Sequence, residues 1–280
     1  MNEKKSLLSE PPISRYSLEI TISPYSLEIT TLLPLQIWGF CNGLFCVLSE
    51  RPERVYLWNP STRTSKKLPE ISSPGYVRSY GFGWVESSDE YKVFVLLVHY
   101  DYYRGIDNWV GKVYSSKTKS WKTTGYLPVS WERGVFAGGK LYWMSSVYQD
   151  INFLDLKSEV FGRIELPFDH EFCRKWYWFV DVLGGLLCVL CHIELNSNAV
   201  RVWVMKEEAW KRVATFAHLV ELLQPSPLLV DHKGEILVNC GSILLAYNRQ
   251  DNVFREHEVY HCGTVHVYVD VESLVSPEDL

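Results

Sequence analysis

The sequence of 280 residues lacks the features that mark membrane, secreted or nucleic-acid-binding proteins. No run approaches the roughly 18 to 20 apolar residues that a transmembrane helix needs, and residues 1–12 (MNEKKSLLSEPP) lack the apolar centre of a signal peptide. The net charge of −5 gives no overall attraction to nucleic acids or anionic membranes. These absences predict a cytoplasmic or nuclear protein that binds neither nucleic acid nor membrane.

Cysteine does not occur in the pattern of a disulfide scaffold. The seven cysteines are odd in number and have no framework spacing, so we expect reduced, buried thiols and no disulfides. Cys188 and Cys191, followed by His192, have a spacing seen in metal sites. Residues three apart on a strand point to opposite faces, so we predict two buried cysteines, no metal site and no cofactor.

Catalytic signatures are missing as well. The sequence has no G-x-S-x-G elbow, no phosphate loop ending in Gly-Lys-Ser/Thr and no H-E-x-x-H. The GFG at residues 81–83 lacks the third glycine and the helix of a dinucleotide site. Residues 169–171 (DHE) include acid and base side chains, but they are adjacent and follow a strand end, which is typical of an exposed loop. The sequence therefore predicts a protein that is not an enzyme.

The sequence is rich in strand-forming residues, which recur in a fixed order. Aromatic residues make up 14% of the chain, which favours strands over helices. Five apolar segments follow glycine or polar turns, and they are separated by steps of roughly 46 to 49 residues, the period of a propeller blade. These segments read GLFCVL, YKVFVLLV, GKLYWM, GLLCVL and GEILVN.

Each repeat divides into four short strands. In the first repeat we expect strands at residues 35–41, 44–49, 54–59 and 64–69, with Asn42-Gly43 as a tight turn of positive φ. We predict an all-β, kelch-like β-propeller with five blades. A sixth, closing blade is expected from the two termini, where YSLEIT occurs twice before residue 35 and a lone strand begins at residue 264.

Four motifs in order are more specific than the repeat itself. The sequence contains LWNPSTRTSKKLP (57–69), GFGWVESSDEYKVFVL (81–96), GGKLYWM with INFLDL and IELPF (138–168), and VWVMKE with a following Trp (202–210). Together they resemble the F-box associated domain of plant F-box proteins, over residues 36–275. The resemblance implies a kelch-like interaction module that captures a target protein for an SCF-type cullin ubiquitin ligase and has no catalysis of its own.

Two of these motifs have a structural interpretation. In WNPST, Asn59 and Pro60 are expected to begin a turn in which the Asn59 side chain bonds nearby backbone groups. In GFGW, the glycines permit close strand packing or a bulge, while Phe82 and Trp84 are expected to point to one face and fill the space between blades.

The resemblance does not include the F-box. Members of the family begin with a helical F-box of about 45 residues, whereas residues 1–34 contain the YSLEIT duplication. We expect residues 35–275 to form the propeller domain and residues 276–280 a tail. Docking to a Skp-type adaptor and cullin requires an F-box in the full protein; without one, the chain is a decoy or scaffold that binds the target without delivering it. An enzyme or sugar-binding propeller is a further alternative.

Two connections contain aromatic residues and Arg where polar residues are expected, at residues 100–109 (YDYYRGIDNW) and 168–178 (FDHEFCRKWYW). Such side chains are the commonest anchors of protein interfaces. Gly105 and Asp107-Asn108 predict a turn in the first connection. Both connections should emerge on one face of the propeller and bind a partner protein. The predicted contact residues are Tyr102, Tyr103, Arg104, Trp109, His170, Phe172, Arg174 and Trp176.

Overall fold

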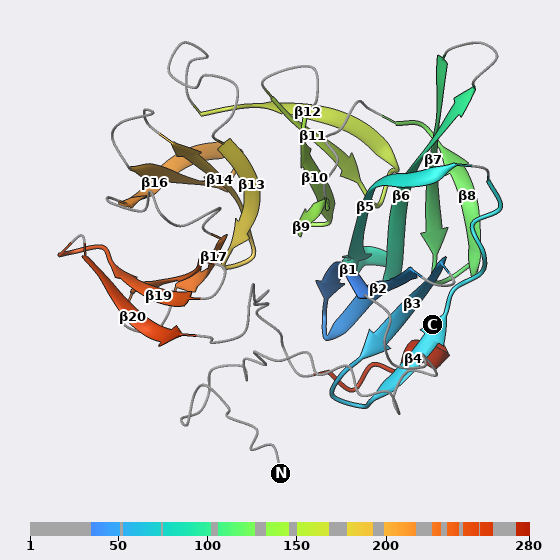
Figure 1. The fold of residues 1–280 in the computed structure, drawn as a ribbon, viewed down its shortest axis with the longest axis horizontal. Helices are drawn as coiled ribbons and strands as arrows, with labels where there is room; N and C mark the ends of the chain where they lie inside the picture. The colour runs from blue at the N-terminus through green and yellow to red at the C-terminus, as the bar shows by residue number, and fades with distance from the viewer. Residues whose placement is uncertain are drawn as a thin grey trace. The chain divides into compact units, whose positions relative to one another are not determined.

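The computed structural model describes residues 35–50, 53–73, 75–101, 106–126, 133–145, 150–167, 178–192, 199–216, 226–230, 234–240, 243–251, 253–259 and 273–280. These residues form twenty strands and two short 3-10 helices. Every strand belongs to one of five four-stranded sheets, in which strands that are consecutive in sequence are neighbours (Figure 1). Each sheet is the meander of a propeller blade, and we number the blades 1 to 5 along the chain.

The strand bounds follow the repeat closely. Blade 1 contains β1 (Leu35–Cys41), β2 (Leu44–Glu50), β3 (Glu53–Asn59) and β4 (Thr64–Lys67). Blade 2 contains β5 (Tyr76–Val85), η1 (Glu86–Ser88), β6 (Glu90–Asp101), β7 (Ile106–Ser115) and β8 (Ser120–Thr124). Blade 3 contains β9 (Val135–Ala137), β10 (Lys140–Met144), β11 (Asp150–Asp155) and β12 (Val160–Glu165). Blade 4 contains β13 (Trp178–Leu183), β14 (Leu186–His192), β15 (Val200–Lys206) and β16 (Ala209–Phe216), and blade 5 contains β17 (Ser226–Val230), β18 (Ile236–Asn239), β19 (Ile243–Asn248) and β20 (Val253–Val259). η2 (Pro277–Asp279) follows near the end of the chain.

The turn between the first and second strands is the one expected from the sequence. Asn42 and Gly43 both have positive φ, at 49° and 77°, which matches the twist of a two-residue hairpin. The turn between the third and fourth strands also recurs, and there a side-chain oxygen accepts a hydrogen bond from a backbone N–H two or three residues later. The four acceptors are Asn59, Ser115, Asp155 and Asn248.

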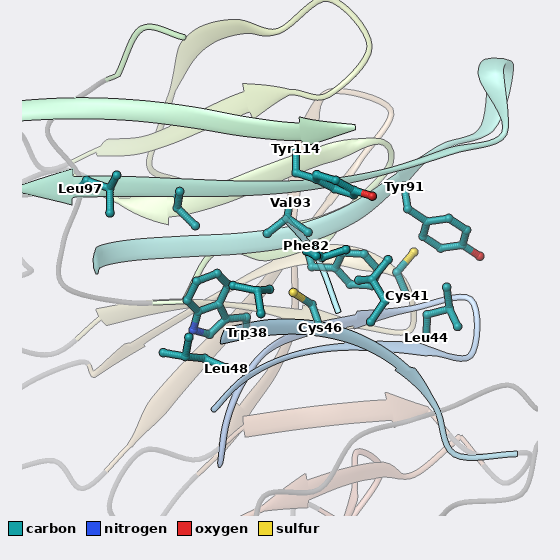
Figure 2. Packing of buried hydrophobic residues seen from close by; sticks show 14 residues of the cluster. Trp38, Cys41, Leu44, Cys46, Leu48, Phe82, Tyr91, Val93, Leu97 and Tyr114 are labelled. Carbon is teal, nitrogen blue, oxygen red and sulfur yellow. The ribbon is translucent and has the colours of Figure 1, made fainter. Parts of the chain in front are cut away.

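The chain forms two compact units, and the first contains blades 1 and 2, most of blade 3 and residues 273–280. Its two apolar clusters lie on the two faces of β6. Val93, Val95 and Leu97 join a cluster with blade 1, which is built around Trp38 and is shown in Figure 2. Phe94 and Leu96 belong instead to a cluster that includes residues of blade 3. Because both faces of β6 are buried, its sequence is an almost unbroken apolar run.

The second unit contains blades 4 and 5 and has its own apolar cluster. Residues of β14, β15 and β18 make up much of this cluster, and Phe216 and Tyr247 meet edge to face with ring centres 4.8 Å apart. The Tyr247 hydroxyl donates a hydrogen bond to the Thr215 carbonyl at 2.9 Å. Blades 4 and 5 are thus joined by an apolar core and by a hydrogen bond.

The predicted sixth, closing blade falls on segments outside the described residues. Among the described residues, no helix is long and apolar enough to cross a membrane.

Candidate protein-interaction surface

The hairpin of β6 and β7 is the longest in the described part of the chain. Its pairing runs from Lys92 opposite Ser115 to Asp101 opposite Ile106, and the hairpin extends past its neighbours in the sheet (Figure 1). Asp107 and Asn108 lie in β7, so the predicted turn is wrong at these two residues, while Gly105 lies outside the described residues. Cross-strand pairing overrides the local turn preference of these two residues.

Three exposed aromatic side chains lie at the far end of this hairpin or on the segments beside it. Tyr76 is 47% exposed, Tyr100 42% and Tyr126 43%. Six large apolar side chains of the described residues are at least 42% exposed, and three of the six are these tyrosines. Grouped exposed apolar side chains mark a candidate interaction surface. We call Tyr76, Arg78, Tyr100, Trp109 and Tyr126 the aromatic end of blade 2.

Strand register brings these residues together. Val98 in β6 pairs with Tyr76 in β5 and with Trp109 in β7, so their side chains lie on one face of the sheet. Tyr100, two residues beyond Val98 on the same strand, is on that face too. The register shifts at Arg78, between Val77 and Ser79; such a bulge redirects a side chain.

Trp109 is the centre of the aromatic end. The guanidinium carbon of Arg78 lies 4.9 Å from the centre of the Trp109 ring, and the Tyr126 ring stacks on it with centres 6.0 Å apart at 18°. Arg78 approaches from the β5 side of the sheet and Tyr126 from the β8 side. Trp109 is half-buried and packs against the cluster between blades 2 and 3. It therefore supports its neighbours, while the tyrosines are the more accessible side chains.

A glycine allows Tyr126 to reach Trp109. A side chain at Gly111 in β7 would place its Cβ 2.3 Å from the Gly125 carbonyl oxygen. That distance is well below van der Waals contact, so only glycine lets the chain leaving β8 pass this close to β7. Tyr126 directly follows Gly125, and the close approach sets the position of its ring.

Of the predicted contact residues, Trp109 lies among the described residues and belongs to the aromatic end. Tyr76, Arg78 and Tyr126 were missed by sequence reasoning, because their neighbours are set by strand register and by a bulge. One feature of the sequence could have indicated this site. The apolar run in β6 is unusually long, which indicates a hairpin that extends beyond the neighbouring strands. The remaining predicted contacts fall on residues that the structure leaves undescribed: Tyr102, Tyr103, Arg104, His170, Phe172, Arg174 and Trp176.

The first unit contains a buried ammonium group, that of Lys92. Its Nζ donates to the Leu156 carbonyl and to Glu159 Oε1, each at 2.8 Å. Lys122 Nζ lies 2.8 Å from the other oxygen of Glu159. Burial raises the pKa of the Glu159 carboxyl, but the hydrogen bonds from Lys122 and Lys92 outweigh it, so the net shift is downward. These contacts join blade 2 to blade 3.

The two cysteines of β14 are buried, as predicted. Cys188 packs in the apolar cluster of the second unit, and the described residues contain no group of three His, Cys, Asp or Glu side chains that could hold a metal ion. Cys191 is disulfide-bonded, so the prediction of no disulfides is wrong. A disulfide depends on which cysteines the fold brings within reach, and spacing along the sequence does not show that.

The four free thiols among the described residues are expected to be unreactive in the folded protein. Burial raises the pKa of the Cys41 and Cys240 thiols to about 12, and that of Cys46 and Cys188 above the usual value. At about pH 8 little reactive thiolate is present, so alkylation of these four residues should be at least about a hundredfold slower than in guanidinium. Peptide mass spectrometry measures this residue by residue, and equal rates in the folded and unfolded protein would contradict it.

Comparison with known families decides what these blades are. The model of the F-box associated beta propeller domain matches residues 12–276. The chain belongs to this family. The family match and the five sheets confirm the prediction of an all-β chain built from propeller blades.

Three relatives from Arabidopsis thaliana carry names consistent with the family. F-box/kelch-repeat protein At3g23880 is 29% identical over 269 residues, which covers 88% of this chain and 70% of the relative. F-box protein At3g07870 is 26% identical over 321 residues, covering 90% and 75%. F-box protein CPR1 is 29% identical over 234 residues, covering 65% and 52%. The aligned region does not include an F-box.

The motifs of the F-box associated propeller have the predicted structural roles. Asn59 Oδ1 accepts hydrogen bonds from the N–H groups of Ser61 and Thr62, as expected for a turn. A Cβ at Gly83 would lie 2.3 Å from the Phe136 ring, which shows how closely blades 2 and 3 pack at GFGW. Phe82 belongs to the cluster between blades 1 and 2, with Trp84 packed against it.

Proposed function

We propose that this F-box associated propeller is the target-binding domain of an SCF-type cullin ubiquitin ligase, acting in the cytoplasm or nucleus. The proposed domain spans residues 35–275. Family membership and the F-box names of the relatives support the ligase role. The observation that supports target binding is the aromatic end of blade 2, where three tyrosines are exposed and one of them, Tyr126, stacks on Trp109.

Tyrosine suits this role because it combines a large contact area with a hydrogen-bonding group and loses little rotamer freedom on binding. Arginine adds a planar group with several hydrogen-bond donors. Trp109 holds Arg78 and Tyr126 in place before a partner arrives, which lowers the entropic cost of association. Tyr102, Tyr103 and Arg104 occur between β6 and β7 in the sequence and remain part of the proposed contact set. The propeller itself makes no bonds; it holds a target near the ligase and raises its effective concentration for ubiquitin transfer.

Removal of the exposed rings tests target binding. The triple variant Tyr76→Ala, Tyr100→Ala, Tyr126→Ala, expressed as the full protein in plant tissue, should recover at least about tenfold less target in affinity purification than the unmodified protein. Val160→Ala, which truncates an exposed apolar side chain in blade 3, is the matched control and should recover target normally. Equal target recovery by the triple variant would remove the aromatic end from the proposal.

The same purification separates a receptor from a decoy. A receptor should recover a Skp-type adaptor and cullin, and the triple variant should recover them as well as the unmodified protein does, because the aromatic end serves the target alone. Recovery of target without adaptor would favour the decoy or scaffold.

A further inference from the structure

Residues 273–280, which we call the strap, lie along blade 1 and are held through their backbone. The side-chain amide of Asn59, at the end of β3, donates to the carbonyl oxygens of Ser273 at 2.9 Å and Val275 at 2.7 Å. Asn59 is fully buried. One amide group thus contacts two carbonyls that are two residues apart.

The rest of the strap adds a turn and apolar contacts. Ser276 Oγ accepts a hydrogen bond from the Glu278 N–H at 3.3 Å, and the next residue, Pro277, is buried in η2. Lys66 Nζ donates to the carbonyl oxygens of Leu280 and Glu278. Val275 and Leu280 pack against the cluster between blades 1 and 2. Blade 1 therefore contacts the strap through backbone acceptors and a few apolar side chains.

The equivalent turns show that strap binding is separate from turn formation. Ser115 and Asp155 occupy the position of Asn59 in blades 2 and 3, and their oxygen atoms alone make the turn. Asn248 does the same in blade 5, where its amide group donates to Glu235 at 3.2 Å. The turn requires an acceptor and no donor, so the NH2 group of Asn59 is available for the two carbonyls of the strap.

We propose that this part of blade 1 is a peptide-binding site, which the strap occupies as an intramolecular ligand and from which it can be displaced. The ligand class is an extended peptide that presents two carbonyls to Asn59 and continues into a Ser-Pro turn. Leu274 is 90% exposed and contributes nothing to binding. The site contacts mainly backbone carbonyls and a short turn. A separate peptide of the same sequence can therefore make the same contacts once the strap has left the site.

A vacated site tests the proposal directly. Val275→Asp in the full chain places a charge against the apolar cluster and should release the strap. A fluorescent synthetic peptide with the sequence SLVSPEDL should then bind, as measured by anisotropy, and adding Asn59→Asp should weaken binding about tenfold or more because Asp accepts hydrogen bonds but donates none. Asn248→Asp in the same background is the matched control and should leave peptide affinity unchanged. Absence of binding to folded Val275→Asp, or equal affinity after Asn59→Asp, would overturn the proposal.

A second measurement does not depend on whether Val275→Asp folds. A nitroxide on Leu274→Cys reports strap motion in the full chain, and its exposed position leaves the strap contacts intact. Asn59→Asp keeps the turn acceptor and should convert an immobile label into a mobile one, while Asn248→Asp should not. A label that stays immobile in a cooperatively melting Asn59→Asp protein would show that Asn59 does not hold the strap.

Discussion

Replacing Glu159 with glutamine is expected to lower the free energy of unfolding by about 3 kcal/mol, because it leaves the buried ammonium group of Lys92 without its nearest countercharge. Lys92 is 5% exposed, and its Nζ lies 2.8 Å from Glu159 Oε1 but 3.9 Å from Glu90 Oε2. Glutamine keeps the size and one acceptor, so the loss measures mainly the charge. Urea denaturation followed by tryptophan fluorescence gives the difference.

The matched control is the other lysine bound to the same carboxylate. Lys122 also lies 2.8 Å from Glu159 but its side chain is 71% exposed, so Lys122→Ala should cost no more than about 1 kcal/mol. If Glu159→Gln and Lys122→Ala lowered the free energy of unfolding by similar amounts, burial of Lys92 would not be the cause of the larger loss expected for Glu159→Gln.

The same variant should show a defined dependence on pH. The folded pKa of the Glu159 carboxyl is below its ordinary value of 4.5, since hydrogen bonds from Lys122 and Lys92 exceed the effect of burial. A lowered folded pKa means that the stabilisation is present above the unfolded pKa and is lost as pH falls through the folded pKa. The stability difference between the unmodified protein and Glu159→Gln should therefore narrow below about pH 4.5.

Much of the fold could be predicted because local signals and tertiary packing agree. The two-residue turn at Asn42-Gly43 needs positive φ, and the sequence supplies residues that tolerate it. The continuous apolar run in β6 reflects burial on both faces, between blades 1 and 3. Each strand of blade 1 was predicted within two residues of its observed ends. Because the sequence repeats, the four-strand pattern of blade 1 also predicted the strands of the other blades.

The contacts between distant segments could not be predicted. Asn59 was recognised as a turn residue, but the partners of its amide group are more than 200 positions away. Lys92 in the motif DEYKVF looks like one charge among several, and its burial depends on the Leu156 carbonyl and Glu159 of blade 3. Such pairs depend on how blades pack, and the sequence of one blade does not contain that information.

The contact residues predicted from the sequence share one described residue, Trp109, with the aromatic end of blade 2. Aromatic composition led to Trp109, because aromatic residues are rare in connections. The structure places Trp109 in a strand, between Arg78 and Tyr126. Tyr126 reaches it because Gly111 lets the chain pass close to β7. The strand register of blade 2 and the close approach of Gly125 to Gly111 therefore decide which residues lie next to Trp109. Amino-acid composition shows neither.

Gly83→Ala is the second variant with a large expected effect, a loss of about 3 kcal/mol from overpacking between blades 2 and 3. The new Cβ would lie 2.3 Å from the Phe136 ring and 2.7 Å from a methyl group of Leu156. Leu156 is fully buried, and Phe136 packs against both apolar clusters of the first unit, so both neighbours resist displacement. Thermal or urea unfolding of the full chain measures the loss.

A compensating variant distinguishes this cause from a general effect of alanine. Phe136→Leu removes the ring atoms that the new methyl group meets, so the double variant with Gly83→Ala should be more stable than the sum of the two single losses by about 1 kcal/mol or more. Gly125→Ala is the neutral control, since its Cβ would meet nothing closer than 4.0 Å, a Phe161 ring atom. If the losses of the two single variants simply add in the double variant, the destabilisation by Gly83→Ala arises in the backbone of β5. If the double variant is more stable than that sum, the destabilisation arises from the contact between blades 2 and 3. That contact would then account for the second glycine of GFGW, as a residue that fixes the distance between neighbouring blades.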